Sequence, residues 1–130
     1  MILKFKTTAD NHLKSKNVAV AGVSNDKTKF GGRVFRNLKK RGYNVYPLNP
    51  KLKEFDGEKC FPAIDELPEN IELLICVTPP PITETLIKEA AENGIKQVWL
   101  QPGAESKEAI RLCRKKGISV VSKTCIMMSS

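Results

Sequence analysis

The chain alternates short apolar runs with segments whose apolar residues recur at helical spacing. Residues 17–23 form a β-branched apolar run, whereas Val34, Phe35 and Leu38 would share one side of a helix. The same alternation continues to the end of the chain. It predicts strands over residues 17–23, 44–48, 72–77, 96–100 and 118–121, a short extended piece around 59–61, helices over 32–41, 80–93 and 106–116, and one or two helical turns over 63–67.

This β-α-β-α order predicts an α/β fold, a Rossmann-like doubly wound domain with a mainly parallel sheet of about five strands. The strands are apolar throughout, as is typical when helices cover both faces of a sheet. We expect a single domain over residues 1–130, in which residues 1–16 are an irregular or short helical lead-in and residues 124–130 are a tail.

Ligands of such sheets bind outside the carboxyl ends of the strands, near the point where the strand order reverses. The loops after the first four main strands are therefore the candidate site. They span residues 22–32, 48–53, 77–81 and 100–105, and each contains glycine, proline or a small polar residue.

The first of these loops suits a phosphate group through Gly22, Ser24, Asn25, Gly31, Gly32 and Arg33. Glycines permit a sharp turn and leave amides open at the start of a helix, where anions bind. A cation such as Arg33 is unfavourable there unless an anion is present, which favours ligand contact. The alternative is that these residues only shape the turn. Neither the G-x-G-x-x-G pattern nor the P-loop pattern occurs in the loop.

The second loop argues against a plain NAD site. An NAD-binding strand usually ends in an acidic residue that holds the ribose diol. Here the strand ends in Asn49, Pro50 and Lys51, followed by Lys53. Neutral and cationic residues suit a phosphorylated ribose, as in NADP or coenzyme A; surface lysines in a turn are the alternative.

The third and fourth loops carry no evident acid–base pair. Thr78, Pro79 and Pro80 form a rigid rim that could flank an adenine ring or a pantetheine arm, or could only stop a strand and start a helix. Gln101 and Gly103 stand at the expected mouth of the pocket. We assign the neighbouring Trp99 to the core.

Composition narrows the function further. The net charge of +8 favours anionic partners, but the lysines are dispersed and only eight residues are aromatic, which argues against nucleic acid. No apolar run is long enough to cross a bilayer, and the start of the chain does not fit a secretory signal. We therefore expect a cytoplasmic protein without a membrane partner.

The four cysteines contain no C-x-x-C pair, and the single His12 cannot complete a zinc site at finger spacing. We expect no metal site. Cys76 and Cys113 fall within apolar patterns and are expected to be buried.

Residues 16–126 together resemble a known family, the small stand-alone coenzyme A-binding proteins, which are similar to the N-terminal domain of the succinyl-CoA synthetase α subunit. The resemblance is carried by Val20-Ala-Gly-Val-Ser24, Gly32-Arg-Val34, Tyr46-Pro-Leu-Asn-Pro50, Gly57-Glu-Lys59, Val77-Thr-Pro-Pro80, Trp99-Leu-Gln-Pro-Gly103 and Cys125. The chain departs from the family in two places. The glycine-lysine element after the second strand is only approximated by Lys51 or Lys53, and Thr124-Cys-Ile126 stands where small relatives have Arg-Cys-Pro.

The resemblance implies coenzyme A at the carboxyl edge of the sheet. Its pyrophosphate would lie over Gly22, Ser24 and residues 31–33, its phosphorylated ribose beside residues 49–51, and its adenine beside residues 77–80.

The residues contain no recognisable catalytic set, so we expect a non-catalytic carrier, sensor or regulatory module for coenzyme A or an acyl-CoA. It would act with a partner protein or as a homo-oligomer. Cys125 is the one residue that could exchange with a thiol, although an inert buried thiol is the simpler interpretation. The alternatives are an NADP-dependent oxidoreductase-like domain and a basic nucleic-acid-binding protein.

Overall fold

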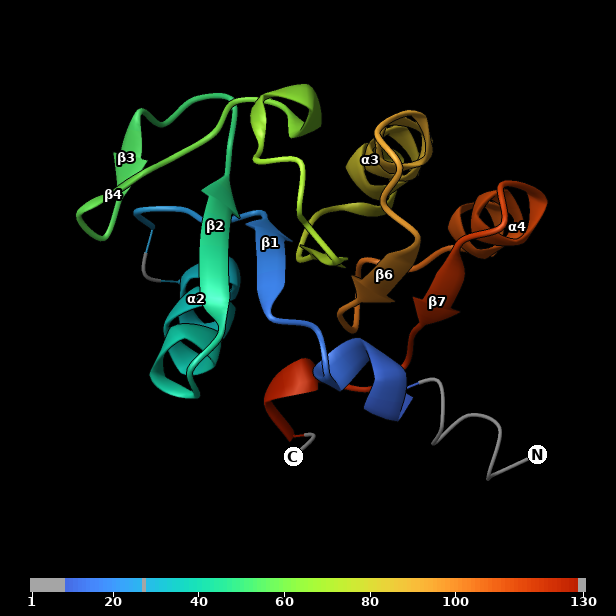
Figure 1. Cartoon of the computed structure of the whole chain (residues 1–130), viewed down its shortest axis with the longest axis horizontal. Coiled ribbons are helices and arrows are strands. Elements are labelled where there is room, and N and C mark those ends of the chain that lie inside the picture. Colours follow the sequence, from blue (N-terminus) through green and yellow to red (C-terminus); the bar gives the residue numbers. More distant parts are fainter. Residues whose placement is uncertain (1–8, 27, 129–130) are drawn as a thin grey trace.

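A computed structural model describes residues 9–26 and 28–128, and in this part of the chain five strands form one parallel sheet (Figure 1). The strands are β1 (Asn17–Ala21), β2 (Asn44–Leu48), β5 (Leu73–Cys76), β6 (Gln97–Leu100) and β7 (Ser119–Val121), in the order β2-β1-β5-β6-β7. The predicted Rossmann-like α/β sheet is therefore confirmed. Most strands are one or two residues shorter than predicted, since pairing ends where the chain turns away at the sheet edge.

The predicted helices are also present. They are α2 (Gly31–Lys40), α3 (Pro80–Glu92) and α4 (Lys107–Lys115), with 3-10 turns η1 (Ile64–Glu66) and η2 (Ile126–Met128). In the predicted lead-in, residues 1–8 lie outside the described residues and residues 9–13 are helical. Of the predicted tail, residues 129 and 130 likewise lie outside the described part.

Alternate residues of the strands pack on opposite faces of the sheet and produce two apolar clusters. In β1, Ala19 and Ala21 face a cluster that includes residues of α3 and α4. Val18 and Val20 face a second cluster, built with α2 and the segments 9–13 and 126–127. Both faces are thus buried, which explains why the strands are apolar at every position.

The strand order reverses between β1 and β5. From β1 the chain crosses to β2 on one side, and from β5 it continues through β6 to β7 on the other. The loops after β1, β2 and β5 consequently meet at the carboxyl edge beside this switch point, which is the position expected for a ligand.

The short extended piece predicted around residues 59–61 is present, since Lys59 belongs to β4 (Glu58–Lys59) and Phe61 forms an isolated bridge with Leu48. The pairing of β4 with β3 (Glu54–Phe55) in a short antiparallel hairpin was not predicted. Its turn holds Asp56 and Gly57 at positive φ, as a two-residue hairpin turn requires. Phe55 is buried and meets the Phe35 ring edge to face at 5.2 Å. The hairpin was missed because two-residue strands show no detectable alternation; packing on α2 holds them together.

The junction between β1 and α2 is a close contact of two glycine backbones. A Cβ atom on Gly31 would stand 2.1 Å from the carbonyl oxygen of Gly22. A Cβ atom on Gly22 would stand 2.1 Å from the Val77 carbonyl oxygen, and Gly22 also has φ of +104°. Both positions therefore require glycine for packing, whatever they contribute to a ligand.

We expect Gly31→Ala to lower the free energy of unfolding by at least about 2 kcal/mol, because the added methyl group meets backbone that cannot move aside. Gly32→Ala is the matched control, since its Cβ would lie 3.2 Å from the flexible Arg36 guanidinium and from Phe55. Its unfolding free energy should change by less than about 1 kcal/mol, helped by the helix propensity of alanine. Denaturant unfolding measures both; equal effects would contradict the packing argument.

Candidate ligand-binding site

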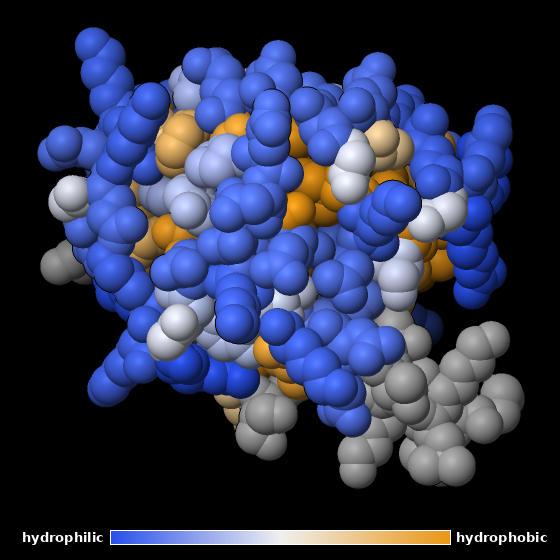
Figure 2. Space-filling model, viewed as in Figure 1, coloured by the Kyte–Doolittle hydropathy of each residue, from blue (hydrophilic) through white to orange (hydrophobic). Residues whose placement is uncertain are grey.

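A groove of about 650 Å³ opens at the carboxyl edge of the sheet, between α3 and the loops after β1 and β2. Its floor is made by the ends of β1 and β2 with Gly22, and one wall by the face of α3. Figure 2 shows exposed hydrophobic residues over the area where α3 approaches η1, on a face that is otherwise mostly hydrophilic. The lining residues are Ala21, Gly22, Lys29, Leu48, Asn49, Pro50, Lys51, Pro62, Ala63, Thr78, Pro79, Ile82, Thr85, Leu86 and Glu89.

A second groove of about 270 Å³ adjoins the first. The two share Gly22, Lys29, Thr78 and Pro79, and the smaller groove continues to Phe30, Val77 and residues 102–104. Together they draw on all four loops predicted from the sequence. A bent or two-part ligand could therefore occupy both across the Gly22–Thr78 junction.

Of the predicted site residues, Gly22, Asn49, Pro50, Lys51, Thr78 and Pro79 line the larger groove, and Gly103 lines the smaller one. Ser24, Asn25, Gly31, Gly32, Arg33, Pro80 and Gln101 line neither groove. The predicted residues at the ends of β1, β2 and β5 thus line the larger groove, whereas most of the expected phosphate donors of the first loop line neither groove.

The loop between β1 and α2 is folded by its own polar residues. The Asp26 amide donates to the Ser24 hydroxyl at 3.1 Å, and Asp26 accepts from the Thr28 amide and hydroxyl at 2.9 and 2.7 Å. The Thr28 hydroxyl and then its amide lower the pKa of the Asp26 carboxyl. Ser24 therefore shapes the turn, and Asn25 is exposed at its tip.

The start of α2 has no side-chain cap. Its N-cap, Phe30, is in the helical region and supplies no side-chain hydrogen bond, and the first turn holds no acidic residue. Gly31 and Gly32 are buried there, while Arg33 is exposed. An uncapped and acid-free helix start is electrostatically suited to an anion.

Asn49 joins two walls of the larger groove. Its side-chain amide donates to the Val23 carbonyl at 2.7 Å, and its side-chain oxygen accepts from the Lys51 amide, also at 2.7 Å. Its backbone amide donates to the Phe61 carbonyl at 2.9 Å. Asn49 is consequently a structural bracket that fixes the loop from which Lys51 extends.

The rim formed by Thr78, Pro79 and Pro80 is rigid. The Thr78 and Thr83 hydroxyls are 2.7 Å apart, and Thr83 also donates to the Pro79 carbonyl at 3.3 Å. Pro79 is the extended N-cap of α3, and Pro80 occupies the first helical position. Proline suits that position because its missing amide has no helical partner to lose.

Gln101 differs from the expectation that its side chain faces the pocket. It is only 1% exposed, its Oε1 accepts from the Ile126 amide at 2.8 Å, and its Nε2 donates to Cys125 Sγ at 3.2 Å. Its backbone follows β6 as predicted, but its side-chain amide is hydrogen-bonded to residues 125 and 126 of the tail. Trp99 is fully buried and donates to the Thr124 carbonyl at 2.9 Å, which confirms its assignment to the core.

Sequence reasoning missed the contribution of α3. Ile82, Thr85, Leu86 and Glu89 all line the larger groove, together with Lys29, Pro62 and Ala63. Ile82, Leu86 and Glu89 follow Pro79 at intervals of three or four residues, the spacing of one helix face. Ile82 is also 51% exposed, an unusual position for a large apolar side chain. The spacing is the signal in the sequence that could have indicated this wall, whereas the exposure of Ile82 is visible only in the structure.

Within the described residues, thiols and a carboxylate near the site are held by burial or by hydrogen bonds. Burial raises the pKa of the Cys60 and Cys76 thiols, and that of Cys113 to about 11. Cys76 and Cys113 are buried as predicted. Glu105 accepts from the Gly103 amide at 3.0 Å. Within residues 9–26 and 28–128, no group of three or more His, Cys, Asp or Glu side chains could hold a metal ion.

None of the helices in the described part of the chain is long and apolar enough to span a bilayer.

We expect Gln101→Leu to lower the free energy of unfolding by about 1–3 kcal/mol, because it leaves the buried Ile126 amide without its acceptor. Denaturant unfolding measures the loss. Amide hydrogen exchange should show the Ile126 amide exchanging faster in the variant. A variant as stable as the parent chain would contradict the role in holding the tail.

Comparison with known proteins identifies relatives of this chain. The chain is 30% identical over 128 residues to the α subunit of acetate–CoA ligase [ADP-forming] II from Pyrococcus furiosus, a match that covers 90% of the chain. It spans only 28% of the length of that subunit. It is also 25% identical over 116 residues to the uncharacterized protein YneT of Bacillus subtilis, covering 89% of the chain and 86% of YneT.

Among solved structures, a conserved hypothetical protein from Pyrococcus furiosus superimposes with a TM-score of 0.85. It is 36% identical, and the match covers 88% of this chain and 99% of that protein. The family model described as "CoA binding domain" matches residues 16–130. Because this match takes in nearly all of the sequence, including every loop of the candidate site, the chain belongs to the family of CoA-binding domains.

Proposed function

We propose that this chain binds coenzyme A or an acyl-CoA in the two joined grooves and acts as a non-catalytic carrier, sensor or regulatory module. One observation carries the proposal. At the switch point of the sheet, an uncapped helix start and two lysines adjoin a groove with an apolar wall. That combination suits a ligand with several phosphates, a base and a long neutral arm.

The phosphate groups would lie between the start of α2 and the two lysines. Lys29 lines both grooves, Lys51 lines the larger one, and the Asn49 bracket fixes the loop of Lys51. Ammonium groups and open helix amides attract anions. We assign the pyrophosphate to the α2 start and Lys29, with Arg33 as an outer cation, and the 3′-phosphate of the ribose to Lys51.

The adenine would occupy the larger groove against α3. Ile82, Leu86 and Pro79 supply an apolar surface there, opposite Pro62 and Ala63. Burial of an aromatic base between such surfaces is favourable because apolar area leaves water. The pantetheine arm would then pass Gly22 and Thr78 into the smaller groove, where Phe30, Pro102 and Ala104 are apolar neighbours.

A binding role fits the chemistry of the site better than catalysis. The acids nearest the smaller groove and the phosphate loop, Glu105 and Asp26, accept hydrogen bonds from neighbouring loop groups. Cys125 accepts from Gln101, and the other three thiols are buried. Because the chain spans only 28% of its ligase relative, an activity of that whole subunit would depend on parts that have no match here.

We expect saturating coenzyme A to raise the thermal midpoint, because a ligand that binds only the native state stabilises it by about 2.7 kcal/mol at one hundred times its Kd. Titration calorimetry gives the affinity, with NADPH as the comparison ligand. Binding of NADPH in preference to coenzyme A would favour the oxidoreductase-like alternative. No heat and no shift with either coenzyme A or acetyl-CoA would refute the proposal.

The non-catalytic part of the proposal has its own test. The protein with acetate, coenzyme A and ATP should form no acetyl-CoA above the rate of a protein-free mixture, as followed by chromatography. Formation of acetyl-CoA that depends on the protein would contradict it.

We expect Lys51→Ala to weaken binding of coenzyme A by roughly 3- to 30-fold, about 0.7–2 kcal/mol, through loss of a partly exposed charge-assisted hydrogen bond. It should leave the affinity for dephospho-CoA unchanged, because that ligand lacks the 3′-phosphate. Lys53→Ala is the matched control, since Lys53 is exposed and lines neither groove. Equal losses for both ligands would remove Lys51 from the 3′-phosphate site.

A further inference from the structure

Gln101 joins the smaller groove to the tail. Its backbone amide donates to the Cys76 carbonyl at 3.0 Å, and its carbonyl accepts from the Ala104 amide at 2.8 Å. The second bond closes the turn of residues 101–104, and residues 102–104 of this turn line the smaller groove. The backbone of Gln101 therefore fixes one wall of that groove.

The side chain of Gln101 holds the tail. Its Oε1 accepts from the Ile126 amide at 2.8 Å, and its Nε2 donates to Cys125 Sγ at 3.2 Å. The whole residue is only 1% exposed. If the tail leaves, both side-chain bonds are lost. Gln101 then keeps only its backbone bonds, so the turn beside the groove is less firmly held.

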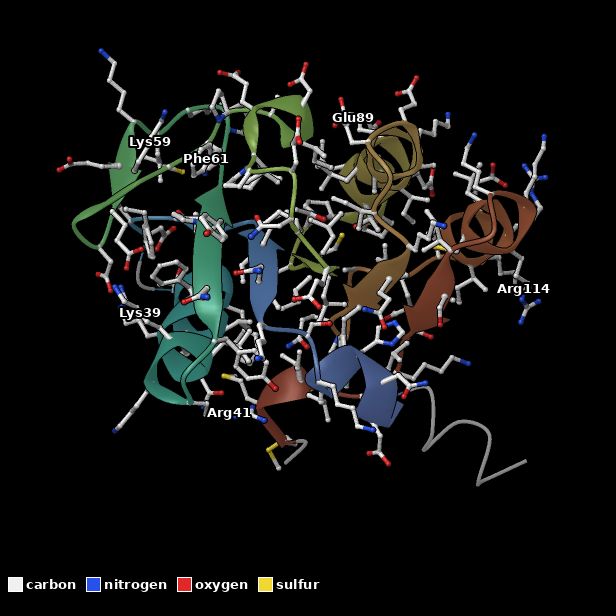
Figure 3. All side chains as sticks on the ribbon, viewed as in Figure 1. Lys39, Arg41, Lys59, Phe61, Glu89 and Arg114 are labelled. Atoms are coloured by element: carbon white, nitrogen blue, oxygen red, sulfur yellow. The ribbon has the colours of Figure 1, made fainter. Side chains whose placement is uncertain are left out.

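The tail is held by few contacts. Of residues 124–128, only Ile126 is buried. Trp99 donates to the Thr124 carbonyl at 2.9 Å. Arg41 donates to the Ile126 carbonyl at 3.1 Å, and Figure 3 shows this arginine beside η2. Such a segment opens locally at a lower free energy than the core, so its docked and released forms exchange while the sheet stays folded.

Docking of the tail and binding in the smaller groove therefore affect each other. A released tail leaves the turn more mobile, and a ligand that contacts a mobile turn must order it, which weakens binding. A ligand that has already ordered the turn favours docking of the tail by the same factor, since the coupling between two sites is reciprocal. The ligand need only contact residues 102–104 for this to occur.

We propose that Gln101 couples the smaller groove to the tail, so that a ligand arm in this groove favours the docked tail and the docked tail favours binding of the arm. Gln101 is thus a positioning residue, and the state of the tail reports whether the groove is filled. The inference rests on the proposed function, since it assumes that the pantetheine arm of coenzyme A occupies the smaller groove. It adds a regulatory element to that site.

Amide hydrogen exchange tests the effect of the ligand on the tail. The chain is saturated either with coenzyme A or with adenosine 3′,5′-bisphosphate, the nucleotide part of coenzyme A without the arm. Exchange of the Ile126 amide should be about five-fold slower with coenzyme A, at the lower end of couplings between sites. The amides of β1, which open only with the whole sheet, correct for general stabilisation by the tighter ligand.

The Ser15 amide is the internal control. It donates to the His12 carbonyl at 3.1 Å in the lead-in, where residues 9 and 13 pack on the same face of the sheet as the tail. After the same correction, its exchange should be equal with the two ligands.

Two variants test the effect of the tail on the ligand. Ile126→Ala removes the buried anchor of the tail and changes no groove residue, and Gln101→Leu removes both side-chain bonds. Each should weaken binding of coenzyme A about five-fold and leave the affinity for the bisphosphate within about two-fold of the wild type. A purely structural role would lower the thermal midpoint without changing the ratio of the two affinities.

Leu13→Ala is the matched control, because Leu13 packs on the same face from the lead-in and lines neither groove. Its affinity for coenzyme A should stay within about two-fold of the wild type. Thermal midpoints of all the proteins verify that each is folded at the temperature of the titration.

The possible failures are distinguishable. If the two ligands protect the Ile126 amide equally after correction, or if both variants keep the wild-type ratio of affinities, the coupling through Gln101 is wrong while binding of coenzyme A stands. If the wild type binds neither ligand, the proposed function itself fails, and the inference with it.

Discussion

The candidate site depends on the close approach of two backbone segments at the end of β1. The backbones of Gly22 and Gly31 lie so close together that a Cβ atom on Gly31 would overlap the Gly22 carbonyl. A Cβ atom on Gly22 would overlap the Val77 carbonyl in the same way. These contacts place the start of α2 directly beside the loop after β5. Without them the helix amides, the Thr78 rim and Lys29 would not share one edge of the sheet. The position of α2 in the fold thus depends on the lack of side chains at Gly22 and Gly31.

Around this contact, buried or half-buried polar side chains hold the remaining loops. Asn49 brackets the loops after β1 and β2, Thr83 fixes the rim after β5, and Gln101 ties the tail to the end of β6. Asn49 and Gln101 pair with backbone groups of these loops, and Thr83 pairs with the Thr78 hydroxyl, in buried or partly buried places where an unmade hydrogen bond is costly. Several residues that look like ligand donors in the sequence therefore serve the scaffold on which the site stands.

The order of strands and helices was predictable because the apolar periods of this chain are long and consistent. Residues 44–48 were predicted with their observed bounds, and the loops at the carboxyl edge followed from the general rule for parallel sheets. The hairpin of β3 and β4 was not predictable, since it depends on Phe55 packing against Phe35. The inward orientation of the Gln101 side chain was not predictable either, because a side-chain amide can form hydrogen bonds with the tail or with a ligand equally well. The α3 wall was readable in principle from its spacing, but only once the partner loop 61–63 was known to face it.

Asn49 has a consequence for the energetics of binding. The Asn49 side chain donates to the Val23 carbonyl of the loop after β1 and accepts from the Lys51 amide of its own loop, each at 2.7 Å, so one residue orders the loop after β2 and ties it to the loop after β1. A ligand that binds there contacts loops that are already ordered, so little binding free energy is spent on ordering them. The corresponding cost is inflexibility: a ligand substituent too bulky for this gap requires the two loops to separate, which breaks the hydrogen bond from Asn49 to the Val23 carbonyl.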